Sequence, residues 1–327
     1  MTEHLDRWLS AVIREEIEQR FYRIINEQAS LECLLDDPDF IAAPLNHVGL
    51  FADHGVVHVR DVAAQVLNVL DVCHGVLIPR RSAHRFAFLQ GYGVLLAYLH
   101  DIGMVDFSAF GRAMHPEFAA QAVFDPALDG VIEAIWQENS GGLAWHLLSL
   151  AQRGELAQEP KQVLRELLSL SVGHSKSKVP VAVLNDPDTL RRTLVAAVTS
   201  DLHTLYAEQQ AKKGRPVANV RGGDGEAVRP HPHLARSAQP LPHDAYRWLT
   251  DGRPATAELV EDAIDTVRAL RAADALRQRG AVLETSGHYQ VFVDQHRGNS
   301  LYALRLGRER LYLLELSDPI SAGEANI

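Results

Sequence analysis

The chain has 327 residues, of which 46% are hydrophobic, and this size and composition predict a folded protein with a core large enough to bury an active site. Its formal net charge of −10 at pH 7 argues against a protein that coats nucleic acid, because such binding depends on lysine and arginine neutralising phosphates, but it is compatible with a small phosphorylated substrate. No apolar run approaches the roughly 18 residues of a membrane helix, and the N-terminus lacks the basic-then-apolar pattern of a secretory signal, so we expect a cytoplasmic protein that does not bind membranes.

Residues 1–44 form the first predicted segment. Apolar residues recur at three-to-four spacing over residues 5–30, between acids and bases, which is typical of an amphipathic helix. Such a helix could pack on the core of the protein or on a second copy of the chain. A homodimer through this helix or through the C-terminal segment is therefore one expectation.

Residues 45–280 predict a helical domain, so the expected fold class is mainly α. The helical period continues over residues 58–72, and residues 86–105 are nearly all apolar, which indicates a central, buried helix. Further helices are expected over residues 114–124, 129–138, 143–153, 160–173, 187–212 and 256–279. In such a bundle, ligands from separate helices can converge in the interior although they are distant in the sequence.

Residues 213–243 interrupt this pattern with glycine, proline and charge and without apolar periodicity. They predict a flexible insertion, whose place between two helices of the domain also permits a lid over a site. His231, His233 and His243 lie inside it and could bind a metal adventitiously, but a solvated loop is the simpler interpretation.

Residues 281–327 change to the period of β-strands. Four short runs alternate or are continuously apolar, with turn signals between them, over residues 281–284, 289–294, 300–306 and 310–316. We expect a small antiparallel meander that packs against the helical domain or another subunit, because a small sheet needs a partner surface to be stable.

The most informative residues are the adjacent His100 and Asp101, which end the apolar helix directly before Ile102-Gly103. Other residues able to bind metals fall on helix-forming segments around them, namely His58, His115, His174 and Asp274. Imidazole and carboxylate groups suit Mn, Fe, Co, Ni or Zn, and a carboxylate can bridge two cations. Two divalent cations, with Mg in one site as a further option, could thus be held with open positions for water.

The order His58, His100-Asp101, His115, His174, Asp274 resembles the pattern of the HD-domain superfamily of metal-dependent phosphohydrolases, over roughly residues 45–280. Val62, which follows His58 at a spacing common in that family, and the Ala-Ala-Asp-Ala-Leu string around Asp274 extend the resemblance. It implies an HD-type helical bundle in which all six residues hold two metals. Asp101 would bridge the metals and position a hydroxide.

His-Asp-Ile-Gly, followed by His115 and Pro116, is also similar to the HD-GYP cyclic-dinucleotide phosphodiesterases. Met104 stands where those enzymes have lysine, and the chain lacks their Gly-Tyr-Pro signature. Hydrolysis of cyclic di-GMP is therefore not expected.

Several assignments leave alternatives. Asp201, followed closely by His203, is the rival of Asp274 as the closing carboxylate, because it too ends an apolar helical run. In a site with one metal, His115 and His174 would lie near the substrate as acids or phosphate contacts. His54 is a near neighbour of His58, and His146, between large apolar residues, is interpreted as a core histidine.

Basic residues close to the proposed ligands are candidates for contact with substrate phosphate. Lys176 and Lys178 follow His174, and Arg271 and Arg277 lie three residues before and after Asp274. Arg60, close to His58, is a similar candidate. The alternative for the arginines is pairing within the helix or solvent exposure.

These residues together predict a phosphohydrolase that cleaves a phosphomonoester or phosphodiester by metal-activated hydroxide. Asp101, Lys176 and Lys178 would be its catalytic residues. The family resemblance alone implies a nucleotide substrate. The alternatives are a di-iron oxygenase, because some members of the same superfamily bind two irons with this ligand set, and a non-catalytic sensing or scaffolding module.

Overall fold

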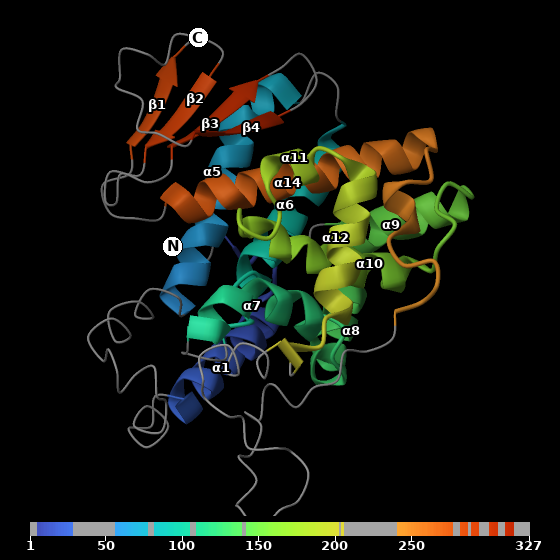
Figure 1. Ribbon diagram of the computed structural model, residues 1–327. Helices are drawn as coiled ribbons and strands as arrows, with labels where there is room; N and C mark the ends of the chain where they lie inside the picture. Colours follow the sequence, from blue (N-terminus) through green and yellow to red (C-terminus); the bar gives the residue numbers. More distant parts are fainter. Residues whose placement is uncertain are drawn as a thin grey trace, which may run out of the picture.

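The computed structural model describes residues 5–28, 56–77, 82–104, 109–138, 142–202, 204–205 and 241–276, together with four C-terminal strands. This part of the chain is mainly helical, as the sequence predicts (Figure 1). Most of the expected insertion, residues 213–240 with His231 and His233, lies outside the described residues.

Side-chain oxygens cap the first turns of two of the helices. Ser82 begins one of them by accepting a hydrogen bond on its hydroxyl from the amide of Arg85, and Glu159 begins another in the same way through the amide of Gln162. In chain order, the helices and 3-10 turns are α1 (Ala11–Gln28), α5 (Val56–Leu77), α6 (Ala83–Leu99), α7 (Ala109–Ala122), η1 (Pro126–Leu128), α8 (Asp129–Glu138), α9 (Leu143–Gln152), α10 (Pro160–Ser169), η3 (Leu170–His174), α11 (Val181–Leu184), α12 (Pro187–Thr199), η4 (Arg247–Leu249) and α14 (Pro254–Leu276).

Two helices differ from the sequence prediction. The helix expected over residues 160–173 is divided, because α10 ends at Ser169 and the chain then tightens into the 3-10 turn η3. The helix expected over residues 187–212 ends at Thr199, because Ser200 has an extended backbone with φ −64° and ψ 134°. Asp201 then starts a new turn by accepting a hydrogen bond from the amide of Thr204.

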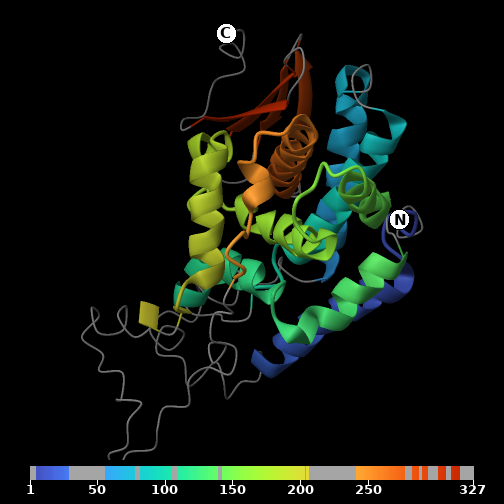
Figure 2. The ribbon, with the colours of Figure 1, turned by 90° about the vertical axis from the view of Figure 1, so that its right-hand side faces the viewer.

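The core is centred on α6, whose residues are buried almost continuously from Phe88 to Leu99. α5 and α14 pack against α6, and α14 also contacts η3 (Figures 1 and 2). Burial around the whole circumference explains why α6 is apolar on every face. None of the helices that the structure describes combines the length and the apolarity needed to cross a membrane.

A buried polar cluster joins α1 to this core. The carboxylate of Glu18, only 4% exposed, accepts hydrogen bonds from the guanidinium of Arg60 on α5 and, at 3.2 Å, from the hydroxyl of Tyr98 on α6. A buried carboxylate needs such partners, because an uncompensated charge in the core is costly. Glu18 thereby fixes the position of α1 against the two helices that lead to the site described below.

The four strands β1 (Val282–Ser286), β2 (Tyr289–Val293), β3 (Leu301–Leu306) and β4 (Leu311–Leu316) pair in sequence order, each antiparallel to the next. The order of the strands in the sheet is therefore the same as their order in the chain. The sheet lies beside α14 and α11 (Figure 1).

Candidate metal centre

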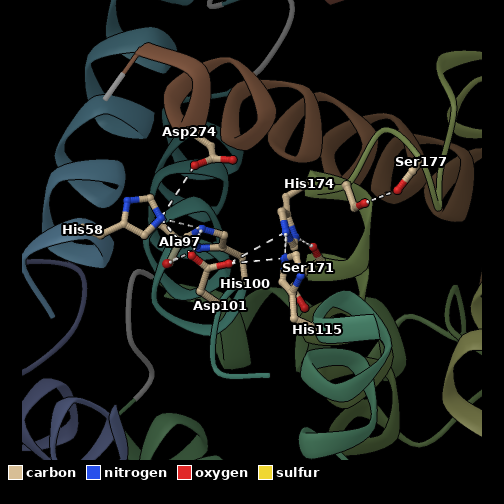
Figure 3. Close-up of polar contacts among 10 residues, drawn as sticks. His58, Ala97, His100, Asp101, His115, Ser171, His174, Ser177 and Asp274 are labelled. Atoms are coloured by element: carbon tan, nitrogen blue, oxygen red, sulfur yellow. Dashed lines mark hydrogen bonds and ion pairs between the residues drawn. The ribbon is translucent and has the colours of Figure 1, made fainter. Parts of the chain in front are cut away.

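Five elements bring histidine and aspartate side chains together in the interior of the protein (Figure 3). These are the side chains predicted from the sequence to hold metals. They are His58 from α5, His100 and Asp101 from the end of α6, His115 from α7, His174 from η3 and Asp274 from α14.

His58, His100 and Asp274 form the first group, with one potential ligand atom of each within 4.8 Å of the others. The Nε2 atoms of His58 and His100 are 3.1 Å apart, and Oδ1 of Asp274 is 3.6 Å from Nε2 of His58. The two imidazoles are buried, whereas the Asp274 side chain is 28% exposed. The group is therefore open to solvent on the side of Asp274.

Asp101, His115 and His174 form the second group. The Nε2 atoms of His115 and His174 are 2.9 Å apart, and they lie 3.7 and 3.8 Å from Oδ1 of Asp101. The His115 side chain is 18% exposed, so this group also has an open side.

Asp101 joins the two groups. Its Oδ2 atom lies 2.9 Å from Nε2 of His58 and 3.2 Å from Nε2 of His100, while its Oδ1 atom faces His115 and His174. The side chain is 2% exposed, so both oxygens are shielded from bulk water. One carboxylate thus presents one oxygen to each histidine pair (Figure 3).

Backbone carbonyls set the orientation of two of the imidazoles. Nδ1 of His100 lies 2.7 Å from the carbonyl oxygen of Ala97, and Nδ1 of His174 lies 2.7 Å from that of Ser171. A carbonyl can only accept, so each Nδ1 carries a proton, and Nε2 holds the lone pair whenever the ring is neutral. Both lone pairs point into the cluster, as in histidines whose second nitrogen is held for metal binding.

The electrostatics of the cluster are strongly perturbed. Burial would lower the pKa of His100, but the charge and hydrogen bond of Asp101 outweigh it and raise that pKa to about 9. Burial, together with His100 and His115, lowers the pKa of His174 to about 3. Burial also lowers the pKa of His58. The pKa of His100 is therefore raised while that of the neighbouring His174 is lowered, so without a cation the imidazoles of the cluster would differ in protonation.

The donor set fits divalent cations. Imidazole nitrogens and carboxylate oxygens are the ligands that Mn, Fe, Co, Ni and Zn share, and cations between these atoms would stabilise the two carboxylates and the converging lone pairs. The buried histidine and aspartate groups could therefore hold metal ions.

Other candidates lie apart from the cluster. Asp201 is exposed and caps its own turn through Thr204, so it does not belong to either group, whereas Asp274 does. His146 is half-buried, its ring centroid lies 4.6 Å from that of Phe88, and it belongs to neither metal group. His54 and His203 lie outside the described residues.

The basic residues have different surroundings. Lys176 is exposed, and Lys178 forms a 2.5 Å ion pair with Glu117. Arg271, only 2% exposed, donates from Nε to the carbonyl of Gly173 at 3.0 Å and from its terminal nitrogen to that of Val179 at 2.6 Å. The guanidinium therefore holds the backbone at both ends of the segment from His174 to Lys178, and its expected contact with substrate phosphate stays a prediction. Arg277 lies outside the described residues.

Sequence reasoning missed Glu117. Its side chain is buried two residues after His115, burial raises its pKa, and its only ion pair among the described residues is with Lys178. No local pattern marks it, because residues two apart on a helix do not share a face and its lysine partner is distant in the sequence. The sequence likewise does not predict the contacts of the Ala97 and Ser171 carbonyls with two imidazoles, because these contacts depend on the backbone conformation.

A scan against protein-family models, a search of curated proteins and a search of solved structures each found no match to this chain.

Proposed function

We propose that this chain is a metal-dependent phosphohydrolase of the HD-domain type, with two divalent cations at the His/Asp cluster. The observation that carries the proposal is the position of Asp101, whose two oxygens face two separate histidine pairs. A carboxylate that presents one oxygen to each of two ligand groups could bridge the two cations of a two-metal site. The order of the ligands along the chain, which resembles that superfamily, supports the same assignment.

The residues would divide the work. His58, His100 and Asp274 would hold one cation, His115 and His174 the other, and Asp101 both. When bound, the two cations would polarise a phosphoryl oxygen and lower the pKa of a water molecule. Substrate would reach the cluster on the side where Asp274 and His115 are partly exposed.

The lysines are the proposed phosphate contacts. Lys176 is exposed, and its ammonium group could neutralise a phosphate oxygen as a point charge. Lys178 is already paired with Glu117, so it would contribute less charge to an approaching anion. The substrate would be a small phosphomonoester or phosphodiester. A nucleotide is the class that the family resemblance implies.

Metal analysis and hydrolysis assays test this function together. The full chain, purified without a histidine tag, should contain close to two transition metals and hydrolyse bis-p-nitrophenyl phosphate or a nucleotide with Mn²⁺. Asp101→Asn, which keeps the shape but removes the bridging charge, should lose both metals and lower turnover by more than about 100-fold, since even indirect ligand partners are worth 10- to 100-fold.

Asp201→Asn is the matched control, because Asp201 is exposed and lies outside both metal groups. It should retain metal and activity. Two irons with no hydrolysis would replace the proposal by a di-iron oxygenase, and a metal-free chain without activity would replace it by a sensing or scaffolding module.

A further inference from the structure

A polar hollow lies away from the metal centre, between α12 and the segment that leads into α14. Its volume is about 450 Å³, and it is lined by Arg191 of α12, by His243, Asp244 and Arg247 before or within η4, and by Asp251 and Arg253 before α14. None of these residues belongs to the His/Asp cluster. A volume of this size is within the range that accommodates small-molecule ligands.

Three arginines and two aspartates line the hollow, so its lining has a small positive formal charge on a chain of formal net charge −10. Nε of Arg191 donates a hydrogen bond to the carbonyl oxygen of Ala245, at 3.1 Å. Within the described ranges, neither Arg191 nor Arg247 forms an ion pair with an acid. Asp251 does not offset them, because it lies 3.5 Å from Nε of Arg253 and accepts a hydrogen bond from Thr256 at 2.6 Å. Two guanidinium groups thus remain able to bind an anion.

Buried contacts fix the backbone that carries Arg247. The preceding residue, Tyr246, has the left-handed conformation with φ 57°, which is unfavourable for a residue other than glycine. Its buried hydroxyl lies 2.6 Å from Oγ of Ser169. The side-chain carbonyl of Gln158 accepts a hydrogen bond from the Trp248 amide at 2.8 Å, and the carboxylate of Glu166 accepts one from the Trp248 indole at 2.9 Å.

This anchoring distinguishes the hollow from an ordinary group of surface arginines. A site whose backbone is already fixed loses less conformational entropy on binding, which raises affinity for a given set of contacts. The strained Tyr246 is held in place by the buried partners around it, and the next residue, Arg247, lines the hollow together with Arg191 of α12.

We propose that this hollow is a binding site for a small phosphorylated ligand, separate from the metal centre. Guanidinium groups bind phosphate through paired, charge-assisted hydrogen bonds, and two of them at one site favour a ligand with more than one negative charge. The carboxylate of Asp244, which also lines the hollow, would repel a phosphate placed next to it. A ligand should therefore present a hydrogen-bond donor to Asp244 or leave water between its phosphate and Asp244. The proposal does not depend on the chemistry at Asp101.

Calorimetric titration of the full chain with inorganic pyrophosphate tests the site, in buffer near 0.15 M salt so that non-specific attraction is screened. The wild-type chain should bind one pyrophosphate at the hollow, in addition to any that metals at the His/Asp cluster bind. Arg247→Gln should lower the affinity about 10-fold, which is the size of one charge-assisted hydrogen bond. Arg192→Gln is the matched control, because Arg192 is adjacent to Arg191 but does not line the hollow and bonds instead to Thr189. It should change the affinity less than about twofold.

Asp101→Asn separates this site from the metal centre. It should retain the pyrophosphate site that Arg247→Gln weakens, even if it abolishes metal binding and hydrolysis, so failure of the proposed function would not affect the result. Thermal unfolding gives a second readout, since a ligand that binds the folded state raises the midpoint, and it should do so in the wild type and Arg192→Gln but less in Arg247→Gln. Absence of saturable binding would overturn the proposal. So would equal losses in Arg247→Gln and Arg192→Gln, or a loss confined to Asp101→Asn.

Discussion

Gly103 lies directly against the backbone of His115: a Cβ atom at position 103 would overlap the carbonyl oxygen of His115 and the amide nitrogen of Ala119. Backbone atoms of a helix cannot turn aside as a flexible side chain can, so only glycine permits this approach. The turn after α6 can therefore bring Asp101 close enough to face His115 and His174. The glycine that follows the His-Asp pair thus has a geometric role in the second ligand group.

Gly103→Ala should separate that turn from α7. We expect the free energy of unfolding to fall by about 1–3 kcal/mol, the usual cost of forcing extra atoms into a packed region. We also expect weaker metal binding by Asp101, His115 and His174. Urea unfolding and elemental analysis measure the two effects.

Gly130→Ala is the control, because Gly130 lies in α8 and a Cβ atom there would meet nothing within 4 Å. It should leave metal content unchanged and stabilise the protein by up to about 1 kcal/mol, since alanine favours helix more than glycine does. Wild-type stability and metal content in Gly103→Ala would show that the contact does not position the turn.

Asp274 and Asp201 offer a direct comparison of the two carboxylates that compete for the closing ligand role. Asp274 lies 3.6 Å from His58 in the first group, whereas Asp201 is exposed and caps a turn. Asp274→Asn should therefore lower the metal content of the purified chain, and Asp201→Asn should not. The reverse order would assign the closing carboxylate to Asp201.

Much of this arrangement could be predicted from the sequence, because its signals are local. Apolar periodicity predicted a mainly helical protein, and the all-apolar run before His100 predicted a buried central helix, which α6 confirms. The six candidate ligands were chosen by residue type and by resemblance, and the structure brings all of them together. Their role as metal ligands stays a prediction.

What the sequence could not predict depends on backbone atoms or on distant partners. The helix beyond Thr199 was expected to continue, and only the extended conformation of Ser200 ends it. The bond between Trp248 and Glu166 joins segments that no periodicity relates. Arg271 shows the same limit. Its position three residues before Asp274 predicts that both side chains lie on one helix face, but the sequence does not show that its guanidinium donates to the carbonyls of Gly173 and Val179.

Arg271→Met separates these two roles. Removing the buried guanidinium leaves the carbonyls of Gly173 and Val179 without these donors, which should lower the free energy of unfolding by about 2–4 kcal/mol. Lys176→Met, at an exposed position nearby, should change it by less than about 0.5 kcal/mol. An Arg271→Met chain with wild-type stability but a higher KM for a phosphorylated substrate would favour the phosphate contact instead.

His146 should make the stability of the fold depend on pH. Burial, with smaller effects of His84 and Arg85, lowers its pKa to about 4 from the ordinary 6.5, so the unfolded chain binds a proton there more readily than the folded chain does. The stabilising contribution is complete above pH 6.5 and is lost as the pH falls from 6.5 towards 4. Between pH 7.5 and 5.0 the loss is about 2 kcal/mol for a shift of this size.

Urea unfolding of the wild type and of His146→Leu at these two pH values measures that contribution. Both proteins retain the titrating groups of the metal centre, so the difference between them isolates His146. The ring centroids of His146 and Phe88 are 4.6 Å apart. Leucine at position 146 keeps an apolar contact with Phe88 but cannot take a proton. The variant should therefore lose about 2 kcal/mol less than the wild type on acidification. Equal losses in the two proteins would show that His146 titrates alike in the folded and unfolded states, as a solvated histidine does.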